Sequence, residues 1–348
     1  MRDDVATVEP SRSTSLPEDA DRILQVDGLS VDFATDHGWA NVVSDVSFSV
    51  GQGEIVGLVG ESGSGKTVTG LSILGLVQRP PGRHAGGHIW FDGRDLTAMS
   101  DKEMRDVRGN EISMIFQEPM TSLNPAFTVG DQIAETVRRH RGGSRKAGMQ
   151  RAVEVLELVG IPNATQRVRS YPHEFSGGMR QRAMIAMSLA CEPKILLADE
   201  PTTALDVTIQ AQILELLGSM REGIGMGVLL ITHDLGVVAE VCDRVVVMYA
   251  GQVVEQSPVA PIFERPRMPY TEGLLSAMPQ VGARSGRLAS IPGRTPEPWN
   301  MPPGCRFHPR CPYTEPKCTE GPIPLEPVGA GWLSRCVRTH ELELNGAK

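Results

Sequence analysis

Short runs of apolar, largely β-branched residues alternate with helix-like patterns from about residue 23 to about residue 264. Several runs are almost continuously apolar, which is typical of strands that are covered on both faces of a parallel sheet. These runs are EIVGLVG (Glu54–Gly60), EISMIF (Glu111–Phe116), KILLAD (Lys194–Asp199), GVLLIT (Gly227–Thr232) and RVVVMY (Arg244–Tyr249). The alternation of strands with helices predicts an α/β core.

Two other patterns modify this core. ILQVDGLSVDF (Ile23–Phe33) and VVSDVSFSV (Val42–Val50) alternate between apolar and polar residues, which favours an antiparallel β subdomain. VGDQIAETVRRHR and RAVEVLELVGI carry apolar residues at i, i+3 and i+4, the spacing of amphipathic helices. We therefore expect an α-helical subdomain, about residues 117–190, inserted into the core.

The composition changes near the end of this region. Sixteen of the 26 prolines fall between Pro258 and Pro327, so residues 265–348 form a separate proline-rich unit with little regular structure. The first 20 residues are acidic and lack the apolar segment of a secretory signal, so we expect a disordered leader. The expected nucleotide-binding unit is then residues 21–264.

The charge and hydropathy of the chain exclude two classes of function. A formal net charge of −8 argues against sequence-independent binding of nucleic acid. The basic stretch from Arg138 to Arg151 is better explained as the solvated surface of two helices and their loop. Because no run of about 18 apolar residues occurs, the sequence predicts no membrane-spanning helix and a cytosolic chain.

GLVGESGSGKT follows the first buried strand and precedes a helical pattern, and it matches G-x-x-x-x-G-K-[ST]. Glycines let the backbone wrap closely around a phosphate, while the helix N-terminus adds partial positive charge. Lys66 is expected to reach the β- and γ-phosphates of ATP, and the hydroxyl of Thr67 suits Mg²⁺. The expected nucleotide-binding residues here are Gly60, Glu61, Ser62, Gly63, Ser64, Gly65, Lys66, Thr67 and Val68.

ILLADE supplies carboxylates at the carboxyl end of another buried strand, where open α/β sheets bind their ligands. Asp199 is expected to hold Mg²⁺, and Glu200 is placed to polarise the attacking water. An apolar run followed by Asp-Glu is a weak signal alone, and it gains weight from the phosphate-binding loop at Lys66.

Four further stretches resemble ATP-binding cassette (ABC) ATPases. FSGGMRQR (Phe175–Arg182) is similar to their signature motif, TALD (Thr203–Asp206) to their D-loop, and ITHDL (Ile231–Leu235) to their switch-histidine segment. FQEPMTSLNP (Phe116–Pro125) resembles their Q-loop in the form found in oligopeptide and dipeptide importers. The resemblance implies the ABC ATPase fold: a mixed sheet core, an antiparallel β subdomain and an inserted helical subdomain.

The resemblance also implies roles for individual residues. Gln117 would contact Mg²⁺ or the attacking water, His233 would bind the γ-phosphate, and His37 stands nearest to the position that stacks on adenine. Ser176 is a good helix N-cap, and the glycines after it allow close approach of an anion. In the family, this motif completes the nucleotide site of the opposing subunit; its residues here are Ser176, Gly177 and Gly178. Asp206, in the segment that resembles the D-loop, is a further expected nucleotide-binding residue.

By the same resemblance, the chain is the ATPase of a peptide importer on the cytoplasmic face of the membrane. Its expected partners are a second, related but different ATPase chain, two permease subunits and, through the complex, an extracytoplasmic substrate-binding protein. An importer of nickel or another small solute shares the same cassette. A soluble cassette ATPase outside transport is the remaining alternative, although the chain has one cassette and no heptad run.

The cysteines are unevenly distributed. Cys191 and Cys242 lie in core segments and are expected to be small buried hydrophobes. The other four thiols, spaced C-x5-C-x6-C-x17-C, favour a metal site over disulfides in a cytosolic chain; they are Cys305, Cys311, Cys318 and Cys336. The loose spacing lacks the C-x2–4-C pair of structural zinc and fits a four-iron, four-sulfur cluster, which the resemblance also implies. Zinc, and thiols that are reduced or disulfide-linked, remain the alternatives.

Overall fold

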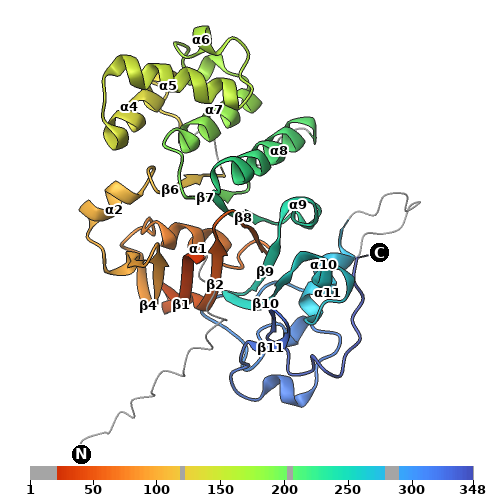
Figure 1. The fold of residues 1–348 in the computed structure, drawn as a ribbon. Coiled ribbons are helices and arrows are strands. Elements are labelled where there is room, and N and C mark those ends of the chain that lie inside the picture. Colours follow the sequence, from red (N-terminus) through yellow and green to blue (C-terminus); the bar gives the residue numbers. More distant parts are fainter. Residues whose placement is uncertain (1–21, 118–121, 202–206, 279–289, 348) are drawn as a thin grey trace, which may run out of the picture.

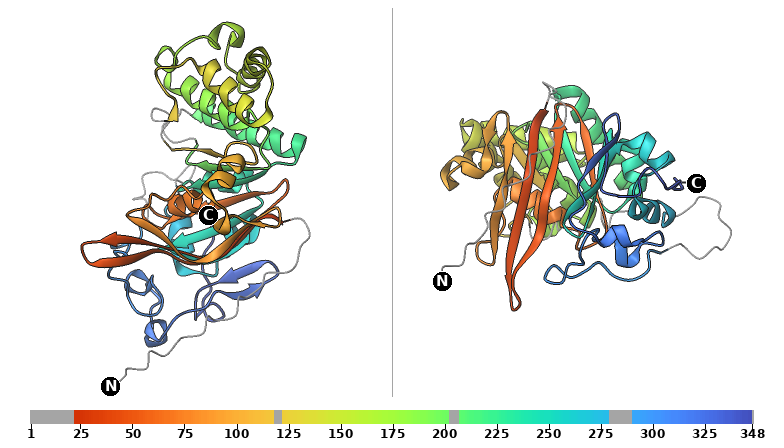
Figure 2. Two further views of the ribbon diagram at one scale, coloured as in Figure 1. Left: turned by 90° about the vertical axis from the view of Figure 1, so that its left-hand side faces the viewer. Right: turned by 90° about the horizontal axis from the view of Figure 1, so that it is seen from below.

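The computed structural model describes residues 22–117, 122–201, 207–278 and 290–347. The expected leader, residues 1–20, lies outside these ranges. Figures 1 and 2 show three layers along the molecule: a group of helices at one end, two sheets in the middle, and the C-terminal extension at the other end.

The central sheet is mixed. Its strand order is β11-β12-β10-β9-β3-β8-β7-β6, and the strands from β9 to β6 run parallel. Nearly every side chain in these parallel strands is buried, which explains their continuous apolar pattern. Their bounds, each within two residues of the predicted runs, are β3 (Ile55–Val59), β6 (Ile112–Ile115), β7 (Ile195–Asp199), β8 (Gly227–Thr232) and β9 (Arg244–Tyr249).

The predicted antiparallel subdomain is confirmed as a sheet of order β2-β1-β4-β5. It is built from two long strands, β1 (Arg22–Thr35) and β2 (Gly38–Gly51), with β4 (Gly82–Phe91) and the short β5 (Arg94–Asp95). The pattern analysis missed β4, because GRHAGGHIWF is rich in glycine and histidine and lacks a regular alternation. Its pairing with β1 stabilises it as a strand.

Helices fill the segment between β6 and β7, where the sequence predicted them. They are α4 (Val129–Arg141), α5 (Arg145–Leu158), α6 (Ala164–Arg167) and α7 (Gly177–Leu189). The side-chain oxygens of Thr128, Ser144 and Ser176 cap α4, α5 and α7 by accepting a backbone N–H three residues on. The short loop between α4 and α5, residues 142–144, is exposed, as are the basic residues Arg141 and Arg145 on either side of it, which agrees with the predicted pair of solvated helices.

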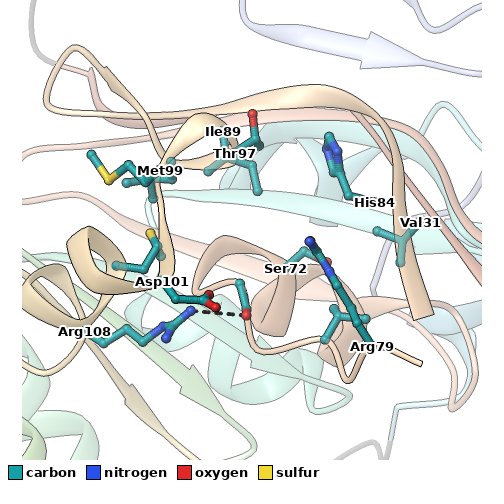
Figure 3. A pocket seen from close by; sticks show the side chains of 13 residues that line it. Val31, Ser72, Arg79, His84, Ile89, Thr97, Met99, Asp101 and Arg108 are labelled. Atoms are coloured by element: carbon teal, nitrogen blue, oxygen red, sulfur yellow. Dashed lines mark hydrogen bonds between the residues drawn. The ribbon is translucent and has the colours of Figure 1, made fainter. Parts of the chain in front are cut away.

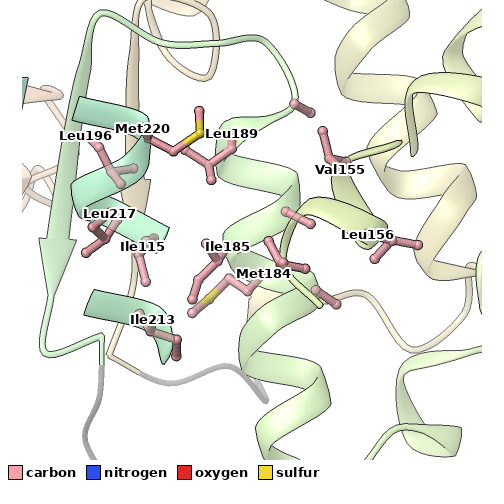
Figure 4. Close-up of a cluster of buried hydrophobic side chains, with 14 of the residues drawn as sticks. Ile115, Val155, Leu156, Met184, Ile185, Leu189, Leu196, Ile213, Leu217 and Met220 are labelled. Carbon is pink, nitrogen blue, oxygen red and sulfur yellow. The ribbon is translucent and has the colours of Figure 1, made fainter. Parts of the chain in front are cut away.

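These helices share one apolar core with the sheet (Figure 4). Ile185 and Leu189 of α7 pack in the same buried cluster as Leu196 of β7 and Leu217 of α8 (Val207–Ile224). A movement of the helical layer therefore acts directly on the strands and on α8. Other helices in the described part of the cassette include α1 (Lys66–Ile73), α2 (Asp101–Val107) and α9 (Leu235–Val241).

The C-terminal region extends the cassette sheet. After β10 (Gln252–Pro258) come α10 (Val259–Glu264) and α11 (Pro269–Ser276), followed by short 3-10 turns at 308–310 and 316–319. Two short strands, β11 (Glu326–Gly329) and β12 (Trp332–Ser334), then pair antiparallel, and β12 pairs with β10. The proline-rich extension is thus hydrogen-bonded to the cassette through its backbone.

A buried carboxyl group lies at this junction. Glu255 of β10 is fully buried, and its Oε1 accepts hydrogen bonds from the backbone N–H of Arg267 (2.7 Å) and the indole N–H of Trp332 (2.8 Å). Burial raises the pKa of Glu255 from 4.5 to about 7, although these hydrogen bonds oppose the rise. In the folded protein, the Glu255 carboxyl group is therefore mostly neutral at pH values below about 7.

This raised pKa makes stability depend on pH. The stabilising contribution of Glu255 is fully present below about pH 4.5 and is lost as the pH rises through about 7. Between pH 5 and pH 8, we expect the wild type to lose on the order of 2 kcal/mol of unfolding free energy relative to Glu255→Gln. Calorimetric unfolding across this range measures the difference. Glu326→Gln, an exposed carboxylate on β11, is the control; parallel pH profiles for wild type and Glu255→Gln would contradict the assignment.

Candidate functional site

The phosphate-binding loop joins the carboxyl end of β3 to α1. A Cβ atom at Gly60 would lie 2.2 Å from the carbonyl oxygen of Met248, so only glycine fits there. Gly65, at φ +98, stands at the N-cap position of α1 in a left-handed conformation that favours glycine. The loop therefore has a conformation that requires these two glycines, and α1 begins directly after it at Lys66.

Lys66 turns back into the loop. Its Nζ donates to the carbonyl oxygens of Gly60 (2.7 Å) and Glu61 (3.0 Å) and lies 3.4 Å from the hydroxyl of Ser64. Burial lowers the pKa of Lys66, while the nearby carboxylates of Glu200, Asp199 and Glu61 oppose that shift. An ammonium held among loop oxygens at this point is suited to bind phosphate oxygens.

Thr67 and Asp199 come together as predicted for a Mg²⁺ site. The hydroxyl of Thr67 donates to Oδ1 of Asp199 at 3.4 Å, although the two residues are 132 positions apart. Burial raises the pKa of Asp199, and the hydrogen bond from Thr67 opposes this rise. Mg²⁺ is usually bound by one or two protein oxygens together with substrate phosphates, so this pair fits the ion.

Gln117, Glu200 and His233 form one connected group. Nε2 of Gln117 donates to Oε2 of Glu200 at 2.9 Å, and Nδ1 of His233 lies 3.0 Å from Oε1 of the same carboxylate. The three residues follow β6, β7 and β8, which are neighbouring parallel strands, so their side chains meet at one edge of the sheet. Glu200 has φ +47, a left-handed conformation found at functional sites, and its N–H donates to the carbonyl of Ile231.

The signature residues lie elsewhere. Ser176 caps α7 by accepting the N–H of Met179 at 3.3 Å, as its sequence position predicts. A Cβ atom at Gly177 or Gly178 would meet no atom within 4 Å, so the backbone there is open to approach. Figure 1 places α7 in the helical layer, away from the N-terminus of α1. The structure therefore does not join these residues to Lys66 within one chain, and Asp206 lies outside the described residues.

His37 is exposed at the tip of the β1–β2 hairpin. Its ring lies 5.3 Å, centroid to centroid, from that of Trp299 in the C-terminal extension, with 32° between the planes. Trp39 instead packs against Arg83, whose guanidinium carbon lies 3.9 Å from the centroid of the Trp39 ring. Of the aromatic side chains near the hairpin, Trp299 was missed by the sequence analysis, because 262 residues separate it from His37.

The four C-terminal cysteines share one pocket. Cys305, Cys311, Cys318 and Cys336 line it together with apolar side chains that include Met268 and Phe307. Burial, together with a smaller effect of the neighbouring thiols, raises the pKa of Cys311 to about 11 and that of Cys336 to about 12. Within the described ranges, no group of three or more His, Cys, Asp or Glu side chains is arranged to hold a single metal ion.

The two remaining cysteines are separate from this pocket. Cys191 is almost fully buried, as predicted for a small hydrophobe. Cys242 is only partly buried, although burial still raises its pKa to about 12. Neither lines the pocket of the other four cysteines.

The extension also reaches the phosphate-binding loop, which the sequence analysis did not predict. Arg310 forms a two-pronged ion pair with the carboxylate of Glu61, at 2.6 and 3.0 Å. The hydroxyl of Tyr270, on α11, accepts the backbone N–H of Glu61 at 2.8 Å. Arg310 directly precedes Cys311 in the sequence, but this local order does not indicate a contact with Glu61.

A separate hollow lies at the other end of α1 (Figure 3). It is lined by Ser72 and Gly75 after the first turns of α1, by His84 of β4 and by Arg108, whose guanidinium donates to the carbonyl of Gly75 at 3.2 Å. Lys66 and the phosphate-binding loop do not line it, so it is distinct from the nucleotide site.

Across the described parts of the chain, no helix has both the length and the apolar character needed to cross a bilayer.

Two family models match the chain. Residues 43–203 match the ABC transporter family, and residues 254–318 match the oligopeptide/dipeptide transporter C-terminal region. The first match contains the phosphate-binding loop, the signature motif and Glu200. The second contains Arg310 and three of the four clustered cysteines.

Curated relatives cover almost the whole chain. A peptide import ATP-binding protein of Brucella suis biovar 1 (strain 1330) is 52% identical over 314 residues, or 90% of this chain and 94% of that protein. One of Brucella abortus (strain 2308) is 52% identical over 331 residues, or 92% of this chain and 98% of that protein.

Solved structures share the cassette. A dimeric ATP-binding cassette in a post-hydrolysis state bound to ADP and Pi matches with a TM-score of 0.62 and 26% identity, covering 68% of this chain and 98% of that chain. CbiO1 from Clostridium perfringens, part of an ABC transporter complex, matches with a TM-score of 0.59 and 26% identity, covering 70% of this chain and 91% of that chain. The chain belongs to the ABC transporter ATPases, within the group that carries the oligopeptide/dipeptide transporter C-terminal region.

Proposed function

We propose that this ATPase of a peptide importer binds Mg-ATP between the phosphate-binding loop and the carboxyl ends of β6, β7 and β8. The observation that carries the proposal is the shared carboxylate of Glu200, which Gln117 and His233 contact from two other strands. Lys66 would bind the β- and γ-phosphates, and Thr67 with Asp199 would hold Mg²⁺. When bound, the ion withdraws charge from the phosphate oxygens.

Glu200 would act on the attacking water. Its carboxylate would accept a hydrogen bond from the water and take its proton as the oxygen attacks the γ-phosphorus, while the bond to the β–γ bridging oxygen breaks. Gln117 and His233 would orient this carboxylate, and His233 would also contact the γ-phosphate. The side chain of Glu200 is 17% exposed, so water has limited access to it before the site closes.

A second cassette would complete the site. The capped N-terminus of α7, with Ser176 and the open backbone at Gly177 and Gly178, offers N–H groups to an anion but does not lie beside Lys66 of its own chain. Two cassettes arranged head to tail would place this motif on the partner's ATP. We propose that Asp206 lies at the same interface and that the partner is a related but different chain.

ATP binding would then move the membrane partners. A peptide-importer ATPase works with a partner ATPase and with permease subunits. We propose that it lies on the cytoplasmic face of the membrane, with two permeases and, through them, a substrate-binding protein. Gln117 follows β6 and leads toward the helical layer, whose core is continuous with β7 and α8. The state of the nucleotide would reach the permeases through these helices.

Two further assignments, the residue that stacks on adenine and the domain boundaries, complete the proposal. We propose that His37 stacks on adenine, where the ring of Trp299 lies 5.3 Å from it. We also propose a division of the chain into a nucleotide-binding domain of residues 21–264, with helical residues 117–190 inserted, and an extension of residues 265–348.

Glu200→Gln tests the hydrolytic site. The amide keeps the size of the side chain but cannot take a proton, so we expect steady-state phosphate release to fall about 100-fold or more, with ATP affinity retained. Equilibrium binding of ATP and phosphate release measure the two quantities. Glu240→Gln, an exposed carboxylate on α9, is the matched control and should behave as the wild type. Wild-type turnover in Glu200→Gln would refute the role of this residue.

We further propose that the four clustered cysteines hold a four-iron, four-sulfur cluster. They line one partly apolar pocket, and the larger frame of a four-iron, four-sulfur cluster suits ligands that are widely spaced in the sequence. Its role would be structural, because the extension has few regular elements and a small core of its own. The ligands would be Cys305, Cys311, Cys318 and Cys336.

Chemical analysis tests the cluster. Protein purified without oxygen should contain about four iron and four acid-labile sulfide per chain. Cys311→Ser should lose most of the iron, whereas Cys242→Ser, at a cysteine outside the pocket, should retain it. One zinc per chain, or no metal, would refute the cluster without affecting the ATP site.

A further inference from the structure

The phosphate-binding loop contains a carboxylate where it is expected to receive phosphates. Glu61 directly follows Gly60, and its side chain is 31% exposed. A free carboxylate beside a polyphosphate lowers affinity through like-charge repulsion. The loop therefore needs a nearby positive charge, other than Lys66, to offset Glu61.

Arg310 of the extension supplies this charge. Both of its terminal nitrogens contact the Glu61 carboxylate, at 2.6 and 3.0 Å, although 249 residues separate the two in sequence. The Arg310 side chain is only 5% exposed, so solvent screens the pair less than it screens a surface pair. Hydrogen bonding to Glu61 raises the pKa of Arg310, which keeps the guanidinium charged.

The guanidinium is held in place from several sides. Its Nε donates to the carbonyl of Pro292 at 2.8 Å, and Nη1 lies 3.3 Å from the hydroxyl of Tyr249. The same guanidinium lies 5.7 Å from the ring centroid of Tyr249 and 5.9 Å from that of Phe307. A side chain fixed in this way positions the carboxylate to which it binds.

Two further contacts join the extension side of the molecule to the loop. Tyr270, fully buried on α11, accepts the N–H of Glu61 at 2.8 Å. Arg306 donates to the carbonyl of Ala250, and the next N–H, that of Gly251, donates to the carbonyl of Ser64 at 3.0 Å. The extension therefore contacts the start of the loop directly, and it reaches Ser64 only indirectly, through the turn at Ala250 and Gly251.

The two arginines are also adjacent to the clustered cysteines. Arg306 directly follows Cys305, and Arg310 directly precedes Cys311. Both cysteines line the shared pocket. A shift of the cysteine region would therefore move both arginines and, through them, the loop.

We propose that Arg310 is a positioning residue for ATP: it neutralises Glu61 and fixes it in the phosphate-binding loop, so that the C-terminal extension sets the ATP affinity of the cassette. This inference rests on the ATP site proposed above. The extension would then contribute to nucleotide binding, in addition to holding any metal.

A charge cycle on the full-length protein tests the proposal. We expect Arg310→Gln to raise the Kd for Mg-ATP about tenfold, because it exposes the phosphates to an unpaired carboxylate. Glu61→Gln should tighten binding, and the double variant should regain most of the affinity lost in Arg310→Gln. Equilibrium binding measures the Kd, and steady-state hydrolysis should show a raised KM with kcat changed less than about twofold.

The controls separate this role from a general loss of structure. Lys317→Gln removes another cation next to a clustered cysteine, but its ion pairs with Glu315 and Glu341 stay within the extension, so its ATP affinity should match that of the wild type. Arg310→Lys, which keeps the charge but not the two-pronged geometry, should lose less affinity than Arg310→Gln. It also provides a test if Arg310→Gln does not fold.

The outcomes distinguish this inference from the ATP site itself. Wild-type affinity in Arg310→Gln, or a double variant as weak as Arg310→Gln, would refute the positioning role. Lys66→Ala should abolish ATP binding whether or not Arg310 contributes. If Lys66→Ala binds ATP as tightly as the wild type, the proposed ATP site is wrong.

Discussion

Both the packing of the core and the assembly of the site follow from the parallel pairing of β3, β8, β7 and β6. Because parallel strands all end at the same edge, the residues that follow them are brought together regardless of their distance in sequence. Lys66 follows β3, Glu200 follows β7 and His233 follows β8. The apolar strands of this sheet, which are buried on both faces, therefore also position the residues that bind and hydrolyse ATP in the proposed site.

The helical layer and the extension act on this edge from opposite ends of the molecule. The helices between β6 and β7 share a buried core with β7 and α8, so a movement of these helices changes the packing beside the site. The extension adds β11 and β12 to the other side of the same sheet. One end of the molecule is thus suited to relay the nucleotide state, and the other end to adjust the loop that binds the nucleotide.

Buried polar groups mark the places where the extension joins the cassette. Glu255 is enclosed at the β10–β12 junction with a raised pKa, and the Arg310 side chain of the Arg310–Glu61 pair is shielded from water. Removing one partner from such a pair leaves the other polar group buried without compensation, which is more costly than losing a surface contact. These contacts tie the extension to particular points of the cassette, whereas apolar packing alone would be less specific.

Features that depend on local order could be predicted from the amino-acid sequence. Continuous apolar runs marked the five parallel strands, and the spacing of Gly60, Gly65 and Lys66 marked the phosphate-binding loop, because loop shape and helix start depend on neighbouring residues. β4 was missed because its strand character comes from pairing with β1. The contacts of Arg310 with Glu61 and of Trp299 with His37 became visible only in the folded chain. No local pattern encodes a contact between residues some 250 positions apart, which arises only when the extension packs against the cassette.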